Sequence, residues 1–212
     1  TESSAASDVY KRQEQEIYSN LLTDINEDRI TLNERMTLSK KETQALYDLV
    51  HNAYTTQKTS EDYIDLLSHV LWNADNFILQ DKTFDELVNS GKLGIIKDQS
   101  LKYRILEYYK SYDIAATHIS ELNQTSIDML SIASKNEPSI KYMGLKKLFD
   151  KDYMFISSDW DYINDPASKG FRLLEQAAGY YYFKNQFLMD YFIKQDSLAK
   201  EMLTSLNLKI SD

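Results

Sequence analysis

Two segments of the sequence each place a carboxylate and an imidazole three residues apart. They are Asp48-Leu-Val-His51 and His118-Ile-Ser-Glu121. At that spacing both groups of a pair lie on one face of a helix. Two such pairs on facing helices, together with His69, would make a two-metal carboxylate site of the kind built inside helical bundles. The pattern is incomplete, because one pair uses Asp and the other runs in reverse order, and both pairs equally suit a solvated surface.

A zinc site without cysteine would require the three histidines to converge. They are His51, His69 and His118, and nothing in their spacing requires them to meet. Metal binding therefore stays an alternative interpretation, and we predict no cofactor.

The stretch from Lys151 to Asn164 is the least regular part of the sequence, and aromatic and acidic side chains are interspersed there. A long irregular segment in a helical domain is often functional, so this stretch is a candidate ligand- or partner-binding loop. The alternative is a loop whose aromatic side chains cover one end of the helices. The acidic residues lack the spacing of a calcium loop. The candidate binding residues are Tyr153, Phe155, Trp160 and Tyr162.

Residues 90–94 (Ser-Gly-Lys-Leu-Gly) contain the Gly-Lys pair of a phosphate-binding loop without the rest of that motif. The motif needs an earlier glycine and a following Ser or Thr, so that backbone N–H groups surround a phosphate. This chain has Glu86 and Leu93 at those positions. We interpret the segment as a structural turn that contains Gly91 and Gly94, with Gly91 ending a short helix in a left-handed conformation.

Composition excludes several classes of function. The net charge of −9 argues against nucleic acid, whose phosphates require basic side chains, and against a broad patch for anionic lipid. The chain has no cysteine, which excludes disulfides and thiolate chemistry and fits either redox compartment. It also lacks the Gly-x-Ser-x-Gly and His-Glu-x-x-His motifs of hydrolases. We therefore predict no catalytic residue.

Long helices are expected because the 212 residues include only five Gly and two Pro. The first helix is expected from about Glu14 to Thr55. Apolar residues recur there at every seventh position in two rows four residues apart, which predicts one packed stripe with a polar middle. The first row is Tyr18, Ile25, Leu32, Ser39, Leu46 and Ala53, and the second is Leu22, Arg29, Met36, Thr43 and Val50.

Capping signals predict where the later helices begin. Thr83 and Glu86 have the spacing of a capping box at the start of the short helix that Gly91 ends. The other expected helices are Glu61 to about Gln80 with Ser60 as N-cap, Leu101 to about Lys135 after a cap from Asp98 or Ser100, Ser139 to Asp150, and Ala167 to about Leu206 after Asp165-Pro166.

The last of these helices carries aromatic side chains on more than one side. They are Tyr180, Tyr181, Tyr182, Phe183, Phe187, Tyr191 and Phe192, following Gly179. A helix that is apolar all round is usually buried, so core packing is the first interpretation. A homotypic or partner-binding face is the second, because aromatic residues anchor interfaces. A stacking platform for a base or sugar is the third.

Residues Ser3 to Gln13 match, residue for residue, a translation of the adapter end carried by transposon-made sequencing libraries. We therefore expect residues 1–13 to be a non-native segment. The natural chain would then begin upstream of Glu14, and a signal peptide or membrane helix could have stood in the lost part.

Residues 14–28, 83–98 and 101–109 resemble an uncharacterised family of single-span bacterial membrane proteins, a domain of unknown function common in Bacteroidetes. The shared features are the start of the first helix around Glu16-Ile17-Tyr18, the turn around Ser90-Gly91, and the pair Tyr108-Tyr109. The resemblance implies a lost N-terminal transmembrane span and places the rest outside the cytoplasm, on the periplasmic side of a bacterial inner membrane. No catalytic residues are known for that family, so none carries over.

These observations predict an all-α fold, an elongated bundle of three to four long helices with short connecting helices. Residues 14–212 would form a single domain. We expect a membrane-tethered, non-enzymatic domain that acts by protein–protein contact as a scaffold or sensor, with a protein partner or a homo-oligomer and no nucleic acid. The alternative is a helical-bundle domain that binds a small ligand or a metal.

Overall fold

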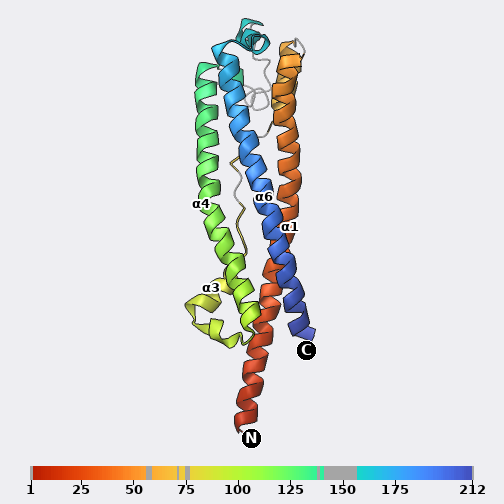
Figure 1. The fold of residues 1–212 in the computed structure, drawn as a ribbon, viewed down its shortest axis with the longest axis vertical. Helices are drawn as coiled ribbons and strands as arrows, with labels where there is room; N and C mark the ends of the chain where they lie inside the picture. Colours follow the sequence, from red (N-terminus) through yellow and green to blue (C-terminus); the bar gives the residue numbers. More distant parts are fainter. Residues whose placement is uncertain are drawn as a thin grey trace, which may run out of the picture. The chain divides into compact units, whose positions relative to one another are not determined.

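The computed structural model describes residues 2–55, 59–70, 72–74, 77–137, 139–140 and 157–211. These residues form α-helices, two 3-10 helices and connecting segments, with no strand among them, so the all-α prediction is confirmed (Figure 1). None of the helices in these ranges has the length and apolarity needed to cross a bilayer. In chain order the elements are α1 (Glu2–Thr55), α2 (Ser60–His69), α3 (Lys82–Asn89), η1 (Lys92–Ile95), α4 (Gln99–Asn136), η2 (Ser157–Asn164) and α6 (Lys169–Ser211).

The chain divides into two compact units, each built from separate stretches of sequence. Helices α1, α4 and α6 each contribute one segment to unit 1 and another to unit 2. Each unit is therefore a helical bundle, and each is described by itself. Unit 1 comprises Thr1–Met36, Phe77–Thr117 and Asp190–Asp212, and unit 2 comprises Thr37–Asn76 and His118–Met189.

The buried stripe of α1 uses a different second row from the one predicted. The first row is buried as expected from Tyr18 to Leu46, including the polar Ser39. The second buried row lies three residues further on, not four, and consists of Leu21, Asp28, Glu42 and Leu49. The predicted row at Leu22, Arg29, Met36, Thr43 and Val50 is only partly buried. The second buried row contains two carboxylates, Asp28 and Glu42, so the apolar pattern of the sequence does not indicate it.

Helix α2 begins and ends earlier than predicted. Its N-cap is Thr59, not Ser60, and a capping box links Thr59 to Asp62. The helix ends at His69, because Val70 adopts an extended conformation. The prediction of a helix reaching Gln80 was therefore wrong.

In unit 1, the segment 77–81 after this helix is neither helix nor strand, and side chains of α1 and α4 bond its backbone. The backbone N–H of Gln80 donates to Asp28 Oδ1 at 2.7 Å. Tyr109 donates its hydroxyl to the carbonyl of Gln80 at 3.3 Å, and Tyr112 donates to that of Phe77 at 3.0 Å. These hydrogen bonds are partly buried, and side chains of α1 and α4 supply the partners that a helix would have supplied to the same backbone groups.

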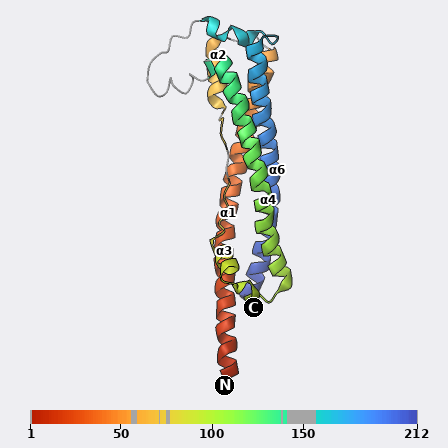
Figure 2. The ribbon, with the colours of Figure 1, turned by 90° about the vertical axis from the view of Figure 1, so that its left-hand side faces the viewer.

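The short helix α3 lies beside α1 in unit 1 (Figure 2). It begins at Lys82 after Asp81, and neither a capping box at Thr83 nor any other side-chain cap is present. Instead, the backbone N–H of Thr83 donates to Asp24 Oδ2 of α1 at 3.2 Å. The capping-box interpretation was wrong because a tertiary acceptor satisfies that N–H.

Gly91 follows α3 with φ of 69°, so the left-handed turn is confirmed. Gly94 lies within η1.

The long helices α4 and α6 also begin at caps. Asp98 Oδ1 accepts the Leu101 N–H at 3.0 Å, which confirms one of the two caps expected for α4. Helix α6 begins at Lys169, two residues later than predicted. Asp165 accepts the N–H of Ala167 and so forms a turn, and the hydroxyl of Ser168 accepts the N–H of Phe171 at 3.1 Å and caps the helix.

Candidate binding groove

A groove of about 360 Å³ lies in unit 2 between the C-terminal part of α1 and the first half of α6. Its apolar lining comes from Leu46 and Val50 of α1 and from Ala178 of α6. Gly179 also lines it, and a Cβ at Gly179 would meet no atom within 4 Å. The missing side chain at this position therefore leaves the space open.

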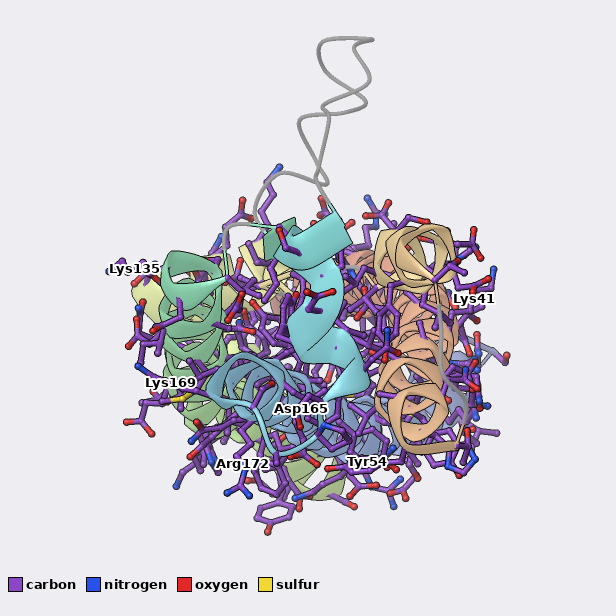
Figure 3. The ribbon with its side chains drawn as sticks, turned by 90° about the horizontal axis from the view of Figure 1, so that it is seen from above. Lys41, Tyr54, Lys135, Asp165, Lys169 and Arg172 are labelled. Carbon is purple, nitrogen blue, oxygen red and sulfur yellow. The ribbon has the colours of Figure 1, made fainter. Side chains whose placement is uncertain are left out.

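Three tyrosines form the rim of this groove. Tyr47 and Tyr54 come from α1 and Tyr182 from α6, with 51%, 55% and 40% of their surfaces exposed. Tyr47 stacks on His51 with ring centroids 5.2 Å apart. Tyr54 packs edge-on against Phe171 at 5.3 Å. The view from above shows Tyr54 and Arg172 on the same side of the bundle (Figure 3).

In the part of the chain that the structure describes, Glu175 is the one carboxylate that lines the groove. It accepts a hydrogen bond from the hydroxyl of Tyr54, and this bond raises the pKa of Tyr54. In the described ranges Glu175 forms no ion pair. The groove thus combines an apolar floor, aromatic walls and a single negative charge.

A second polar feature of unit 2 is buried in the core. Lys184 has no exposed surface, and its Nζ donates to the carbonyl of Asn73 at 2.5 Å and lies 4.8 Å from the ring centroid of Tyr181. The amide groups of Asn73 and Asn185 each lie 3.4 Å from a carboxylate oxygen of Glu42. Because Lys184, Glu42 and Asn185 are buried, no solute reaches these three groups, and we interpret the cluster as structural.

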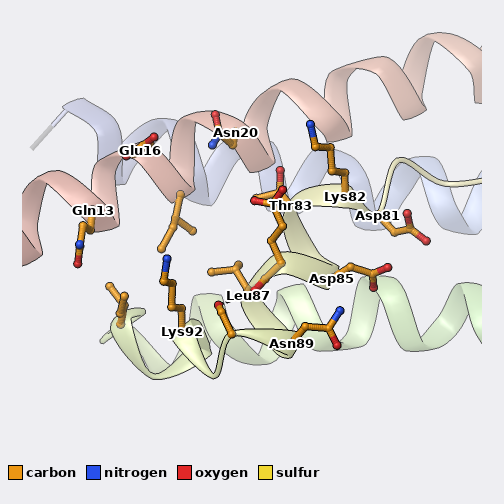
Figure 4. A pocket seen from close by; sticks show the side chains of 14 residues that line it. Gln13, Glu16, Asn20, Asp81, Lys82, Thr83, Asp85, Leu87, Asn89 and Lys92 are labelled. Carbon is orange, nitrogen blue, oxygen red and sulfur yellow. Dashed lines mark hydrogen bonds between the residues drawn. The ribbon is translucent and has the colours of Figure 1, made fainter.

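A larger groove of about 840 Å³ lies in unit 1 between α1 and the segment containing α3 and η1 (Figure 4). Glu16 and Asn20 line it from α1, and Lys92 extends from η1 toward α1. Acidic and basic side chains are interspersed along it, including Asp85 and Lys82. A lining with both charges favours neither an anionic nor a cationic ligand.

The metal-site candidates do not gather into one site among the residues that the structure describes. All three histidines are exposed: His51 stacks on Tyr47, His69 Nδ1 lies 2.7 Å from the carbonyl oxygen of Asp65, and His118 tilts against Phe187 at 4.4 Å. Among the residues with described positions, no group of three or more His, Asp or Glu could hold a metal ion. Of the two remaining candidates, Asp48 is half-buried and accepts a hydrogen bond from Gln44 at 2.8 Å, and Glu121 is exposed.

The candidate loop is only partly described. Tyr153 and Phe155 lie outside the described residues. Trp160 and Tyr162 are on η2 and belong to the core of unit 2, where the Tyr162 hydroxyl lies 3.2 Å from that of Ser139. These two side chains face the core, as in the alternative of a segment that covers the helices.

The aromatic residues of α6 divide between core and surface. Tyr181, Tyr191 and Phe192 are buried, whereas Tyr180, Tyr182 and Phe183 are exposed. Both the core interpretation and the surface interpretation therefore describe part of this helix.

Sequence reasoning missed the groove of unit 2, although its signal is in the sequence. Tyr47 and Tyr54 are seven residues apart, as are Glu175 and Tyr182, with Gly179 between the latter pair. Residues seven apart share a helix face. Two such pairs, one of them with a glycine between its members, could have indicated a groove lined by these side chains.

No protein-family model, curated protein or solved structure matches this chain.

Proposed function

We propose that this chain is a membrane-tethered, non-enzymatic helical domain that acts outside the cytoplasm by protein–protein contact, as a scaffold or sensor. The observation that carries the proposal is an aromatic row on α6. Tyr180 and Phe183 are 38% and 59% exposed, and the partly exposed Phe187 follows on the same helix face. Aromatic side chains on a surface are typical anchors of interfaces.

Burial of this row against a partner would be favourable, because a large apolar side chain gains about 1.5–3 kcal/mol when it leaves water. The acidic surface supports a protein partner over nucleic acid. The tether itself is supported by the resemblance of residues 14–28, 83–98 and 101–109 to single-span membrane proteins. The gene upstream of Glu14 tests it: we expect a stretch of about 20 apolar residues preceded by Lys or Arg.

The aromatic row is tested with a photo-crosslinking amino acid at position 183 in the full chain, expressed in cells. We expect a discrete crosslinked species, either a dimer of this chain or a complex with one partner. Tyr103, which is 66% exposed on α4 in unit 1, provides the matched control position. No product at 183, or the same products at both positions, would contradict the proposal.

A second candidate function is the binding of a small ligand, and the groove of unit 2 favours it. Its volume of about 360 Å³ lies within the usual range for ligand sites. Gly179→Leu would fill the groove at an exposed helix position. A ligand found by thermal-shift screening should therefore stabilise the wild type and not this variant. A shift of equal size in both would exclude the groove.

A further inference from the structure

We propose that the groove between α1 and α6 in unit 2 binds a small alkylated ammonium ion, with Tyr47, Tyr54, Tyr182 and Glu175 as its recognition residues. This inference rests on the second candidate function, that the groove is a ligand site, and adds the chemical class of the ligand. No residue of the aromatic row at 180, 183 and 187 belongs to this site.

The walls of the groove suit a cation. The face of a tyrosine ring carries negative electrostatic potential, and several such rings around one hollow attract quaternary ammonium groups. Here three tyrosines come from two helices, and all three line the same space. One face of Tyr47 is covered by His51, which stacks nearly parallel to it at 12°, and this packing holds the ring in place.

The charge of the groove points in the same direction. Glu175 brings a carboxylate to an otherwise apolar and aromatic lining, and among the described residues it has no ion-pair partner. A cation that leaves water needs a compensating charge, and Glu175 supplies one. An anionic ligand would instead meet the carboxylate and three electron-rich rings.

The floor of the groove distinguishes an alkylated cation from a bare amine. Leu46, Val50 and Ala178 offer only methyl and methylene surface to a ligand. An N–H group pointing at that floor would lose its water without gaining an acceptor, whereas a methyl group would bury apolar surface there. Gly179 provides the room, and a volume of about 360 Å³ is at the small end of ligand sites, which suits a compact ion.

The test uses choline and its neutral isostere 3,3-dimethylbutan-1-ol, which has the same shape without the charge. The full chain is titrated with each, and the amide resonance of Gly179 is followed by NMR. We expect saturable shifts with choline and binding of the isostere weaker by about tenfold or more. Equal affinity for both compounds would overturn the cation assignment and leave the groove as an apolar ligand site.

Variants localise the binding. Tyr182→Ala and Glu175→Gln should each weaken choline binding by about fivefold or more, and Gly179→Leu should abolish it. Tyr180→Ala is the matched control, because Tyr180 is 38% exposed on the same helix, close to the 40% of Tyr182, and lies outside the groove. An equal loss in Tyr180→Ala would overturn the site.

Two further outcomes separate the proposals. If neither choline nor the isostere binds, the cation assignment is overturned, and the thermal-shift screen then decides whether the groove takes any ligand. A trimethyllysine peptide that binds more tightly than choline would place the cation on a partner protein and overturn the small-molecule assignment.

Discussion

The backbone N–H of Gln80 donates to the buried carboxylate of Asp28 at 2.7 Å, which links the non-helical segment 77–81 to the middle of α1 in unit 1. The same carboxylate accepts the hydroxyl of Tyr108 at 2.8 Å through its other oxygen. Burial disfavours the charged form, and it raises the pKa of Asp28 to about 6 despite these two hydrogen bonds.

This pKa predicts a dependence of stability on pH. Because the pKa of Asp28 is higher in the folded state than its usual 3.8, folding favours the protonated form. The stabilising contribution is full below about pH 4 and is lost as the pH rises through about 6. Asp28→Asn removes this titration, so we expect the free energy of unfolding of the wild type to fall, relative to the variant, by on the order of 1–3 kcal/mol between about pH 4 and about pH 7.

Urea denaturation at several pH values measures this difference. Asp24→Asn is the control, since Asp24 is a more exposed carboxylate one turn earlier that also accepts a backbone N–H. Parallel pH profiles for wild type and Asp28→Asn would rule out the titration of Asp28.

The ion pair between Arg29 and Asp196 in unit 1 should give stability the opposite dependence on pH. Burial would raise the pKa of Asp196, but hydrogen bonds from Arg29 at 2.8 Å and Lys200 at 2.6 Å hold it below its usual value. Its stabilising contribution is therefore present above about pH 4 and lost as the pH falls through the lowered pKa.

Arg29→Met leaves the buried carboxylate of Asp196 with less compensating charge, and we expect the free energy of unfolding to fall by about 2 kcal/mol near neutral pH. Lys200→Met should cost less than about 1 kcal/mol, because the Lys200 side chain is 59% exposed. Equal losses for the two variants in chemical denaturation would contradict this ranking.

Lys184 should be required for the stability of unit 2. Its removal in Lys184→Met leaves the carbonyl of Asn73 without that donor, at an expected cost of about 1–3 kcal/mol. Lys194→Met, an exposed position on the same helix, should change the stability by less than about 0.5 kcal/mol. Thermal unfolding of both variants measures the contrast, and a melting temperature of Lys184→Met at or above that of the control would refute it.

The turn after α3 predicts a difference between two glycines. Gly91→Ala forces a side chain into φ of 69°, and we expect a loss of about 1 kcal/mol. Gly94→Ala lies in η1 without a positive φ and with open space at its Cβ position, so it should be neutral or slightly stabilising. Denaturant midpoints of the two variants give the comparison, and a greater loss at Gly94 would show that strain at Gly91 is not the cause.

Local signals predicted much of this fold. The scarcity of glycine and proline indicated long helices, and Asp98 and Gly91 marked boundaries that the structure confirms. These features depend on neighbours within a few residues, so the sequence is enough to show them.

Features that depend on distant partners were missed. Residues 77–81 carry a helix-like apolar pattern, yet Asp28, Tyr109 and Tyr112 offer their backbone groups other partners. The second row of α1 was misassigned because Asp28 and Glu42, both buried, read as surface residues in a sequence. The groove of unit 2 was missed because its two walls are more than a hundred residues apart in the chain, and the seven-residue spacing within each wall does not show that the two walls meet.

The hydrogen bond from Gln80 to Asp28 also determines how the Gln80 amide proton exchanges with deuterium. In a helix an amide proton is shielded by a carbonyl of the same helix, so it exchanges when that helix frays. The Gln80 proton is shielded by a carboxylate from a helix far away in the chain. The exchange rate of the Gln80 amide therefore measures how often the segment 77–81 separates from α1, which is an opening of tertiary structure in unit 1.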